Sequence, residues 1–136
     1  MLAEMGEIRK IQYHHHSILE IDYSGASEEE MMALISQAAQ TGMTENNKVL
    51  VLATHRNNYI TPKFINHAKT VTKDVVHLID KMALVGLTPP QKWILKGYSI
   101  FFQRNFKAFD TRESALLYLT SEHTTDNDLP DYYKKK

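Results

Sequence analysis

The residues best placed for chemistry lie in one polar loop, residues 54–61, between an apolar run at 49–53 and a helix that begins at Thr61-Pro62. In open α/β sheets, ligands bind where a loop leaves the carboxyl end of a strand and enters a helix. Unpaired N–H groups at the start of such a helix also attract anions. The side chains that could add donors or charge there are His55, Arg56, Asn57, Asn58, Thr61 and Lys63. The loop has no phosphate-binding glycine pattern, so an ordinary connecting loop is an equally good interpretation.

The residue types give little support to a catalytic site or a metal site. His55 and Thr61 have no orienting acid beside them, and a threonine that caps a helix is not an activated nucleophile. The run His14–His16 is conspicuous, but neighbouring residues of a strand point to opposite faces, so at most two of the three could share a metal. The chain has no cysteine, which excludes thiolate ligands and nucleophiles. We therefore predict no catalytic residue, metal site or cofactor, and interpret the histidine run as an exposed hairpin end.

A second candidate is the helix predicted over 90–102, which carries more large apolar side chains than one face can hold. Trp93, Ile94 and Phe101 share one face, whereas Leu95 and Phe102 lie on another. One face must pack on the sheet, and the surplus needs some other cover. With the loop, this helix gives a candidate binding surface. Its residues are Arg56, Asn57, Asn58, Thr61, Lys63, Trp93, Lys96, Tyr98, Phe101 and Phe102.

Several partners could cover the surplus apolar face. The neighbouring helix, predicted over 62–79, could do so with its second row Ile65 and Val76. A second copy of the chain in a homodimer, another protein, a lipophilic ligand or a membrane surface would serve equally well. Lys92 and Lys96 lie beside the aromatic residues and could meet anionic headgroups. No nucleic-acid-binding motif is present, so we predict no nucleic-acid partner.

Composition and charge limit the number of domains and the kinds of partner. The 136 residues suit a single domain, and the net charge is zero. The charge is uneven: residues 1–47 contain eight acids and two bases, whereas residues 48–107 contain ten bases and two acids. A basic middle could face an anionic partner, although neutralisation between the two parts in the fold is the plainer interpretation. There is no apolar run long enough to span a membrane and no signal-peptide pattern, so we expect a cytoplasmic protein.

Hydrophobic periodicity predicts an alternating order of elements. The predicted strands cover 7–13, 18–23, 49–53, 82–87 and 106–109, and the predicted helices cover 27–42, 62–79, 90–102 and 110–119. Ser27 with Glu30, Thr88 with Gln91, and Asp110 with Glu113 have the spacing of capping boxes. The order ββαβαβαβα predicts an α/β fold with a mixed, mostly parallel five-stranded sheet and about four helices. Residues 1–121 would form the domain, and residues 122–136 a polar tail.

Three stretches resemble a known family. The run Lys107-Ala-Phe-Asp-Thr-Arg-Glu-Ser-Ala115 resembles the closing strand and helix of SpoIIAA-like proteins, which form part of the STAS superfamily. Residues 83–92, Ala-Leu-Val-Gly-Leu-Thr-Pro-Pro-Gln-Lys, resemble the preceding strand and helix start, and residues 21–25 fit the second strand. The resemblance covers residues 7–121 and implies a STAS-type fold.

The resemblance also implies a kind of function. STAS domains resemble bacterial anti-sigma-factor antagonists, whose switch is a phosphorylatable serine in the pattern Asp-Ser-Ser-Gly. Residues 53–63 depart from that pattern, and Thr61 alone offers a hydroxyl at the helix start. The divergent branch is also similar in topology to Sec14-type lipid-binding domains. The leading hypothesis is therefore a non-enzymatic regulatory or interaction module with an unidentified protein partner. The alternative is a domain that binds a small lipophilic or anionic ligand and associates with membrane surfaces.

Overall fold

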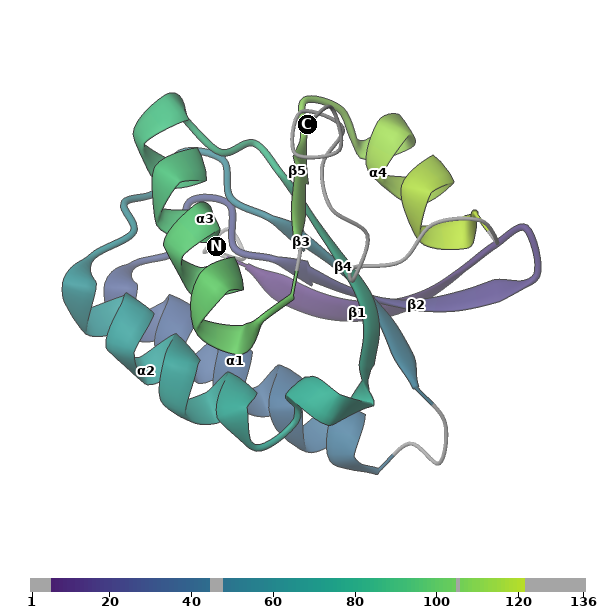
Figure 1. The fold of residues 1–136 in the computed structure, drawn as a ribbon, viewed down its shortest axis with the longest axis horizontal. Helices are drawn as coiled ribbons and strands as arrows, with labels where there is room; N and C mark the ends of the chain where they lie inside the picture. The colour runs from purple at the N-terminus through teal and green to yellow at the C-terminus, as the bar shows by residue number, and fades with distance from the viewer. Residues whose placement is uncertain (1–5, 45–47, 105, 122–136) are drawn as a thin grey trace, which may run out of the picture.

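A computed structural model describes residues 6–44, 48–104 and 106–121 and shows a five-stranded sheet in the order β1-β2-β3-β4-β5 (Figure 1). β1 and β2 form an antiparallel hairpin, and β2 through β5 are parallel. The strands are β1 (Glu7–Tyr13), β2 (His16–Asp22), β3 (Val49–Thr54), β4 (Ile79–Val85) and β5 (Lys107–Phe109). The predicted mixed sheet is therefore confirmed, and four parallel strands end at one edge.

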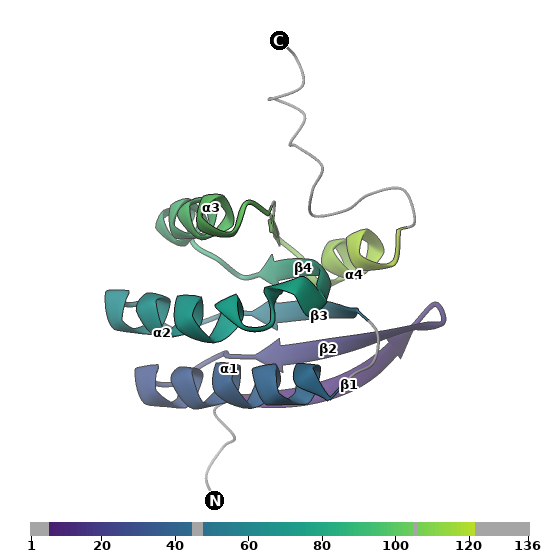
Figure 2. The same cartoon turned by 60° about the horizontal axis from the view of Figure 1, so that its bottom comes forward.

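The helices cover both faces of this sheet. They are α1 (Glu28–Met43), α2 (Pro62–Lys73), α3 (Pro89–Phe102) and α4 (Arg112–Thr120), with a short 3₁₀ turn η1 (Val76–Leu78). Figure 2 shows α1, α2 and α3 in one layer, whereas α4 lies apart from them beside β4. The predicted element order is confirmed. None of the helices in the described ranges is both long and apolar enough to cross a membrane.

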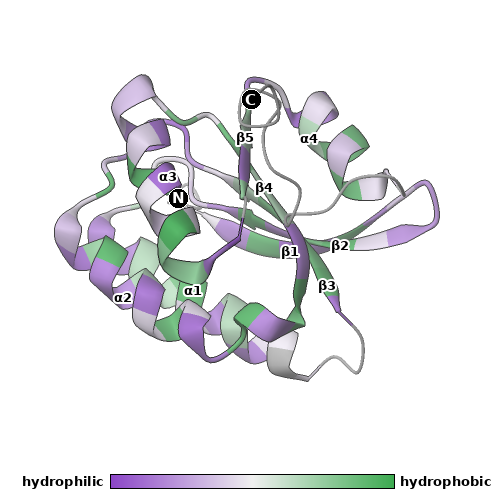
Figure 3. Cartoon of the chain, in the orientation of Figure 1, coloured by the Kyte–Doolittle hydropathy of each residue, from purple (hydrophilic) through white to green (hydrophobic). Residues whose placement is uncertain are grey.

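Each face of the sheet carries its own apolar core. Leu19, Ile21, Val51 and Leu84 pack under α1, α2 and α3, together with Phe64 of α2. The alternate residues on the same strands face α4. They include Ile18, Leu50, Leu52, Ala83 and Val85. This alternation follows from the period of two in a strand. Figure 3 shows apolar residues in the central strands and a mixture of apolar and polar residues along each helix.

The helix starts follow the predicted capping chemistry in three of four cases. Ser27 and Thr88 each accept a bond from the N3 amide, and Glu30 and Gln91 complete the boxes by accepting from the cap amides. Thr61 caps α2, with Pro62 at the first helical position, as predicted. The fourth prediction is wrong.

The start of α4 differs from the prediction by one residue. Thr111, and not Asp110, is the N-cap, and its hydroxyl oxygen accepts from the Ser114 amide. Asp110 is exposed and pairs with Lys92 at 3.5 Å. Thr and Asp are both good caps, so residue preference alone could not choose between two adjacent candidates.

The end of α2 was also predicted incorrectly. α2 stops at Lys73, residues 76–78 form a 3₁₀ turn, and β4 begins at Ile79 and not at Met82. Val75 leaves the helical region, with φ −126° and ψ 0°. A 3₁₀ turn keeps apolar residues about three apart, so periodicity could not separate this turn from a continuing helix. The buried Lys81 further concealed the start of the strand.

Two further points concern the end of α1 and the turn between β1 and β2. α1 continues past the predicted stop at Gly42 to Met43, with Thr44 as C-cap. His14 and His15 form the hairpin turn, with φ of 49° and 69°, and both are exposed. The predicted exposed hairpin end is therefore confirmed for His14 and His15, whereas His16 is half-buried and begins β2.

Candidate functional site

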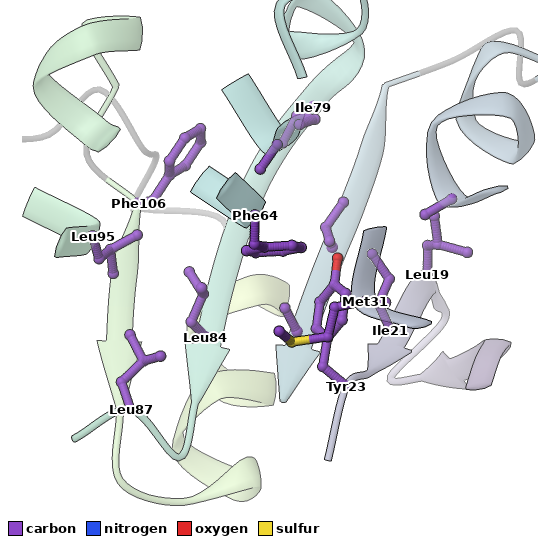
Figure 4. Close-up of a cluster of buried hydrophobic side chains, with 14 of the residues drawn as sticks. Leu19, Ile21, Tyr23, Met31, Phe64, Ile79, Leu84, Leu87, Leu95 and Phe106 are labelled. Atoms are coloured by element: carbon purple, nitrogen blue, oxygen red, sulfur yellow. The ribbon is translucent and has the colours of Figure 1, made fainter. Parts of the chain in front are cut away.

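An apolar cavity of about 120 Å³ lies between the sheet and the layer formed by α1, α2 and α3. Its floor is the sheet, with Val51, Ala53 and Leu84, and its walls include Phe64 and Leu95. Figure 4 shows several of these side chains converging from the strands and from α2 and α3. A dry apolar cavity of roughly 150 Å³ accepts a benzene-sized molecule, and this one is somewhat smaller but of the same order.

The lining includes no Asp, Glu, Lys or Arg side chain among the described residues. Its polar side chains are Tyr23, His55, Thr72, Gln91 and Tyr98. Ligand sites of this kind combine a mostly apolar wall with a few placed polar groups. These five residues therefore decide what the cavity could recognise.

Tyr23 and His55 form a stacked pair at the carboxyl edge of the sheet. Tyr23 follows β2 and His55 follows β3, and these strands pair in parallel. The Tyr23 amide donates to Thr54 O at 2.8 Å, and the His55 amide donates to Val85 O at 2.9 Å, which extends the ladder past each strand end. The rings lie 4.4 Å apart between centroids at an angle of 15°.

Burial keeps both rings of this pair uncharged. Desolvation lowers the pKa of His55 to about 4, against weaker opposing effects of Asn58 and Asp22. Desolvation also raises the pKa of Tyr23 far above its usual value, and Tyr98 adds to the shift. At neutral pH, His55 is a neutral imidazole and Tyr23 a neutral phenol.

The two rings of the pair differ in how their polar atoms are placed. The His55 Nδ1 atom is buried beside the Asn58 side chain, which opposes the lowering of its pKa, and neither Nδ1 nor Asn58 Oδ1 has a hydrogen bond of good geometry in the described part of the chain. The Tyr23 hydroxyl points into the apolar cluster, as Figure 4 shows. A hydroxyl in a mostly apolar cavity wall is a group that could receive a ligand.

The other polar groups of the lining are already engaged. Tyr98 shares a 2.5 Å hydrogen bond with Thr72 and donates to Ala68 O at 3.3 Å. Burial raises the pKa of Tyr98 to about 12, against the smaller opposing effect of Thr72. Gln91 donates through Nε2 to Asn58 O at 3.2 Å and accepts through Oε1 from the Thr88 amide. These contacts join α3 to α2 and to the loop.

The loop after β3 closes one end of the cavity. Asn58 Nδ2 donates to Tyr23 O at 2.7 Å, so this residue ties the loop to the stacked pair. Arg56 and Asn57 are exposed, and Asn57 has a left-handed φ of 57°. Of the loop candidates, Asn58 is therefore part of the cavity's support, and the other two face solvent.

The start of α2 carries a negative neighbour. The Thr61 hydroxyl donates to a Glu28 carboxylate oxygen and accepts from the Phe64 amide at 3.1 Å. Lys63 is exposed, and its Nζ lies 3.9 Å from the other Glu28 oxygen. The carboxylate of α1 thus occupies the position where an anion would meet the N-terminus of α2. An anion or a phosphate on Thr61 would have to displace it.

The outer face of α3 is uncovered in the described structure. Trp93 is 71% exposed, Ile100 69% and Phe101 53%. Lys96 Nζ lies 5.1 Å from the centroid of the Trp93 ring, and Lys69 Nζ from α2 lies 4.8 Å from that of Phe101. We call these five residues the α3 ridge. α2 therefore does not cover the surplus apolar residues of this helix.

The structure divides the predicted candidates of α3 between two places. Trp93, Lys96 and Phe101 lie on the ridge, whereas Tyr98 points inward to the cavity. Phe102 is half-buried and packs edge-on against Tyr98, with centroids 5.0 Å apart. Arg56, Asn57 and Lys63 are exposed elsewhere, at the loop and the start of α2.

The candidate surface from sequence omitted Tyr23, Thr72 and Gln91, and His55 was named only as a loop donor. A signal for Tyr23 and His55 was available, because they directly follow two strands that were predicted to be parallel neighbours. Thr72 had no such signal. It lies on the sheet-facing side of α2, where a threonine is chemically unremarkable until Tyr98 is placed against it.

Comparison with known proteins defines the class of fold. No family model matches the chain, and no curated protein matches it. One solved structure that it resembles is an uncharacterised protein from the DUF3478 family with a SpoIIAA-like fold, from Shewanella loihica PV-4. The TM-score is 0.68, with 14% identity over 88% of this chain and 98% of that one. A second is an anti-sigma-factor antagonist (STAS) domain protein from Planctomyces limnophilus. Its TM-score is 0.60, with 16% identity over 84% of this chain and 98% of that one.

The chain is thus an α/β domain with the SpoIIAA-like fold of STAS domains. The resemblance predicted from residues 21–25, 83–92 and 107–115 is confirmed at the level of the fold. At such low identity the likeness concerns the fold, and function must be argued from the site itself.

Proposed function

We propose that this chain is a non-enzymatic STAS-like binding module that holds a small lipophilic molecule between the sheet and α2 and α3. The cavity carries the proposal: it has a volume of about 120 Å³ and an apolar lining across one face of the sheet, and it reaches the carboxyl ends of β2 and β3 at Tyr23 and His55. A SpoIIAA-like fold is consistent with a regulatory or interaction module, and a bound molecule would be the signal that such a module reads.

The arrangement of polar groups favours binding over catalysis. Among the described residues, no carboxylate lies within hydrogen-bond distance of His55 Nδ1, and the Thr61 hydroxyl is engaged by Glu28 and Phe64. A nucleophile and base normally lie within hydrogen-bond reach, with a third group orienting the base. The position of Glu28 also favours a lipophilic ligand over an anionic one at the loop.

Native mass spectrometry of the chain, purified from its expression host without detergent, tests this function. We expect a retained mass, or failing that a saturable response of the amides around the cavity when toluene is titrated in NMR spectra. Ala68 lies on α2 and lines the cavity. An Ala68→Leu variant should fill the space and abolish binding, whereas Leu95→Ala should enlarge it and tighten binding.

The matched control for the filling variant is Ala33→Leu. Ala33 is on α1, is exposed and does not line the cavity, so the same substitution there should leave binding unchanged. If no mass is retained and toluene moves no cavity amide even in Leu95→Ala, the lipophilic-ligand function is refuted.

A second candidate function concerns the α3 ridge. We infer that this ridge docks on an anionic membrane surface. Aromatic and aliphatic side chains flanked by Lys69 and Lys96 suit the boundary between headgroups and acyl chains. The separation of ridge and cavity on two sides of α3 would let one helix contact both a surface and a ligand.

Vesicle flotation tests the second candidate. The chain should float with phosphatidylglycerol-containing vesicles, less so at high salt, and not with pure phosphatidylcholine. Trp93→Gln with Phe101→Gln should abolish flotation, and Leu117→Gln on α4, another exposed apolar residue, should not. Equal flotation on both vesicle types contradicts the anionic preference. A dimer in sedimentation that Trp93→Gln dissociates would instead make the ridge a homodimer interface and overturn membrane docking.

A further inference from the structure

We propose, on the basis of the proposed function, that the cavity selects an uncharged lipophile with one hydroxyl group and excludes a carboxylate of similar size. The observation that carries this proposal is the Tyr23 hydroxyl, a polar group that points into an otherwise apolar and uncharged wall. The inference narrows the ligand class from lipophiles in general to neutral alcohols.

The absence of charge in the described lining excludes an ionised head group. No lysine or arginine side chain of the described residues contributes to the wall, so a bound carboxylate would be buried without a counter-ion. Burial of an unpaired charge is far more costly than burial of a neutral hydroxyl that can be hydrogen-bonded. His55 does not supply the missing charge, because desolvation keeps it neutral at ordinary pH.

The Tyr23 phenol fits a ligand hydroxyl in particular. Its O–H can donate to a ligand oxygen, and its oxygen can accept from a ligand O–H. A hydroxyl group both donates and accepts, so it can use both capacities of the phenol. A hydrocarbon would leave the phenol without a hydrogen bond, which costs binding free energy.

Tyr118 provides a matched control. It carries the same phenol group and is buried, but it lies on α4 in the apolar core on the other face of the sheet and does not line the cavity. A Tyr→Phe substitution therefore removes the same atom at both positions with different consequences. Only at Tyr23 does it remove a group that is open to the ligand.

The experiment is an NMR titration of the chain with benzyl alcohol, benzoate and toluene, which share one ring and differ in the polar group. We expect benzyl alcohol to bind at least ten-fold more tightly than benzoate. We also expect it to bind about two- to ten-fold more tightly than toluene, the range that one net hydrogen bond gives. Tyr23→Phe should reduce the preference over toluene to near unity, and Tyr118→Phe should leave it unchanged.

Each of three other outcomes would contradict the proposed selectivity. Equal binding of benzoate and benzyl alcohol would overturn the selectivity and leave the lipophilic cavity in place. An equal loss of preference in Tyr23→Phe and Tyr118→Phe would show that the hydroxyls act only through the stability of the fold, which also overturns it. If none of the three molecules moves the amides around the cavity, the proposed function fails together with this inference.

Discussion

The imidazole of His55 lies flat against the phenol of Tyr23, with ring centroids 4.4 Å apart, at the carboxyl edge of two parallel strands. Both rings are buried, and Phe64 from α2 closes edge-on against each of them, at 5.9 Å from Tyr23 and 6.3 Å from His55. A titratable ring in this position couples the stability of the fold to pH, because any proton that it accepts must enter an apolar enclosure.

The chain should therefore lose stability as pH falls from about 6.5 to about 4. The pKa of His55 is lowered to about 4 in the folded chain and returns to the usual 6.5 on unfolding. In this window the unfolded chain binds more protons than the folded one, so acid favours unfolding. The full shift corresponds to about 3 kcal/mol. Urea unfolding at intervals of half a pH unit measures it.

His55→Phe isolates the contribution of this residue. Phenylalanine keeps a flat ring against Tyr23 but cannot accept a proton. Between pH 6.5 and 4, the free energy of unfolding should therefore fall by about 3 kcal/mol less in His55→Phe than in the parent chain. The remaining histidines are common to both proteins and cancel in the difference. Parallel stability curves for the two proteins would show that His55 is not desolvated as described.

The opposite face of the sheet should depend on the ion pair between Glu20 and Arg112. Glu20 is 2% exposed on β2, and Arg112 Nε donates to it at 3.0 Å from the first turn of α4. Burial raises the pKa of Glu20, but the bonds and charges of Arg112 and Arg9 outweigh it and hold the pKa below the usual 4.5. Arg112→Met should cost about 3 kcal/mol of unfolding free energy, because it leaves the carboxylate buried with the weaker partner Arg9.

The double variant Glu20→Met with Arg112→Met separates pairing from burial. It should be more stable than Arg112→Met alone, because no carboxylate is left buried without its main partner. The loss in Arg112→Met should also shrink as pH falls below 4, since protonation of Glu20 removes the charge. A double variant as unstable as the sum of its singles would contradict this account.

A buried lysine should hold the end of α4. Lys81 is 4% exposed on β4, and its Nζ donates to the carbonyl oxygens of Tyr118, at 3.1 Å, and of Ser121. These groups lie at the carboxyl end of α4, where a cation is favourable. Lys81→Met should cost about 2 kcal/mol and speed amide exchange in the last turn of α4. Lys63→Met, at an exposed position, should change stability by less than about 0.5 kcal/mol. Unchanged amide exchange in the last turn of α4 of the Lys81→Met variant would refute this role of Lys81.

Lys81 also illustrates what sequence could and could not provide. Periodicity and capping predicted the element order because they are local properties of neighbouring residues. The start of β4 was misplaced because a lysine in a buried strand is intelligible only once the carbonyl groups of α4 are placed beside it. Prediction of the cavity from sequence was limited in the same way. Tyr23 and His55 are visible as strand ends, but their stacking and the direction of the Tyr23 hydroxyl depend on packing between distant segments.

The last prediction compares two glycines near α3. Gly86 has a φ of +88°, and a Cβ there would lie 2.7 Å from Arg56 Cγ and 3.4 Å from the His55 backbone. Gly86→Ala should therefore cost about 1–2 kcal/mol, through backbone strain and through displacement of the loop that carries His55.

Gly97, inside α3, has open space around it, because a Cβ at this position would meet nothing within 4 Å. Gly97→Ala should stabilise the chain by about 0.5–1 kcal/mol, because alanine loses less backbone entropy in a helix. Thermal unfolding of both variants measures the contrast. Because Gly86 supports the stacked pair, its variant should also bind benzyl alcohol more weakly. A Gly86→Ala chain as stable as the parent would show that residue 86 does not hold the left-handed φ of +88°.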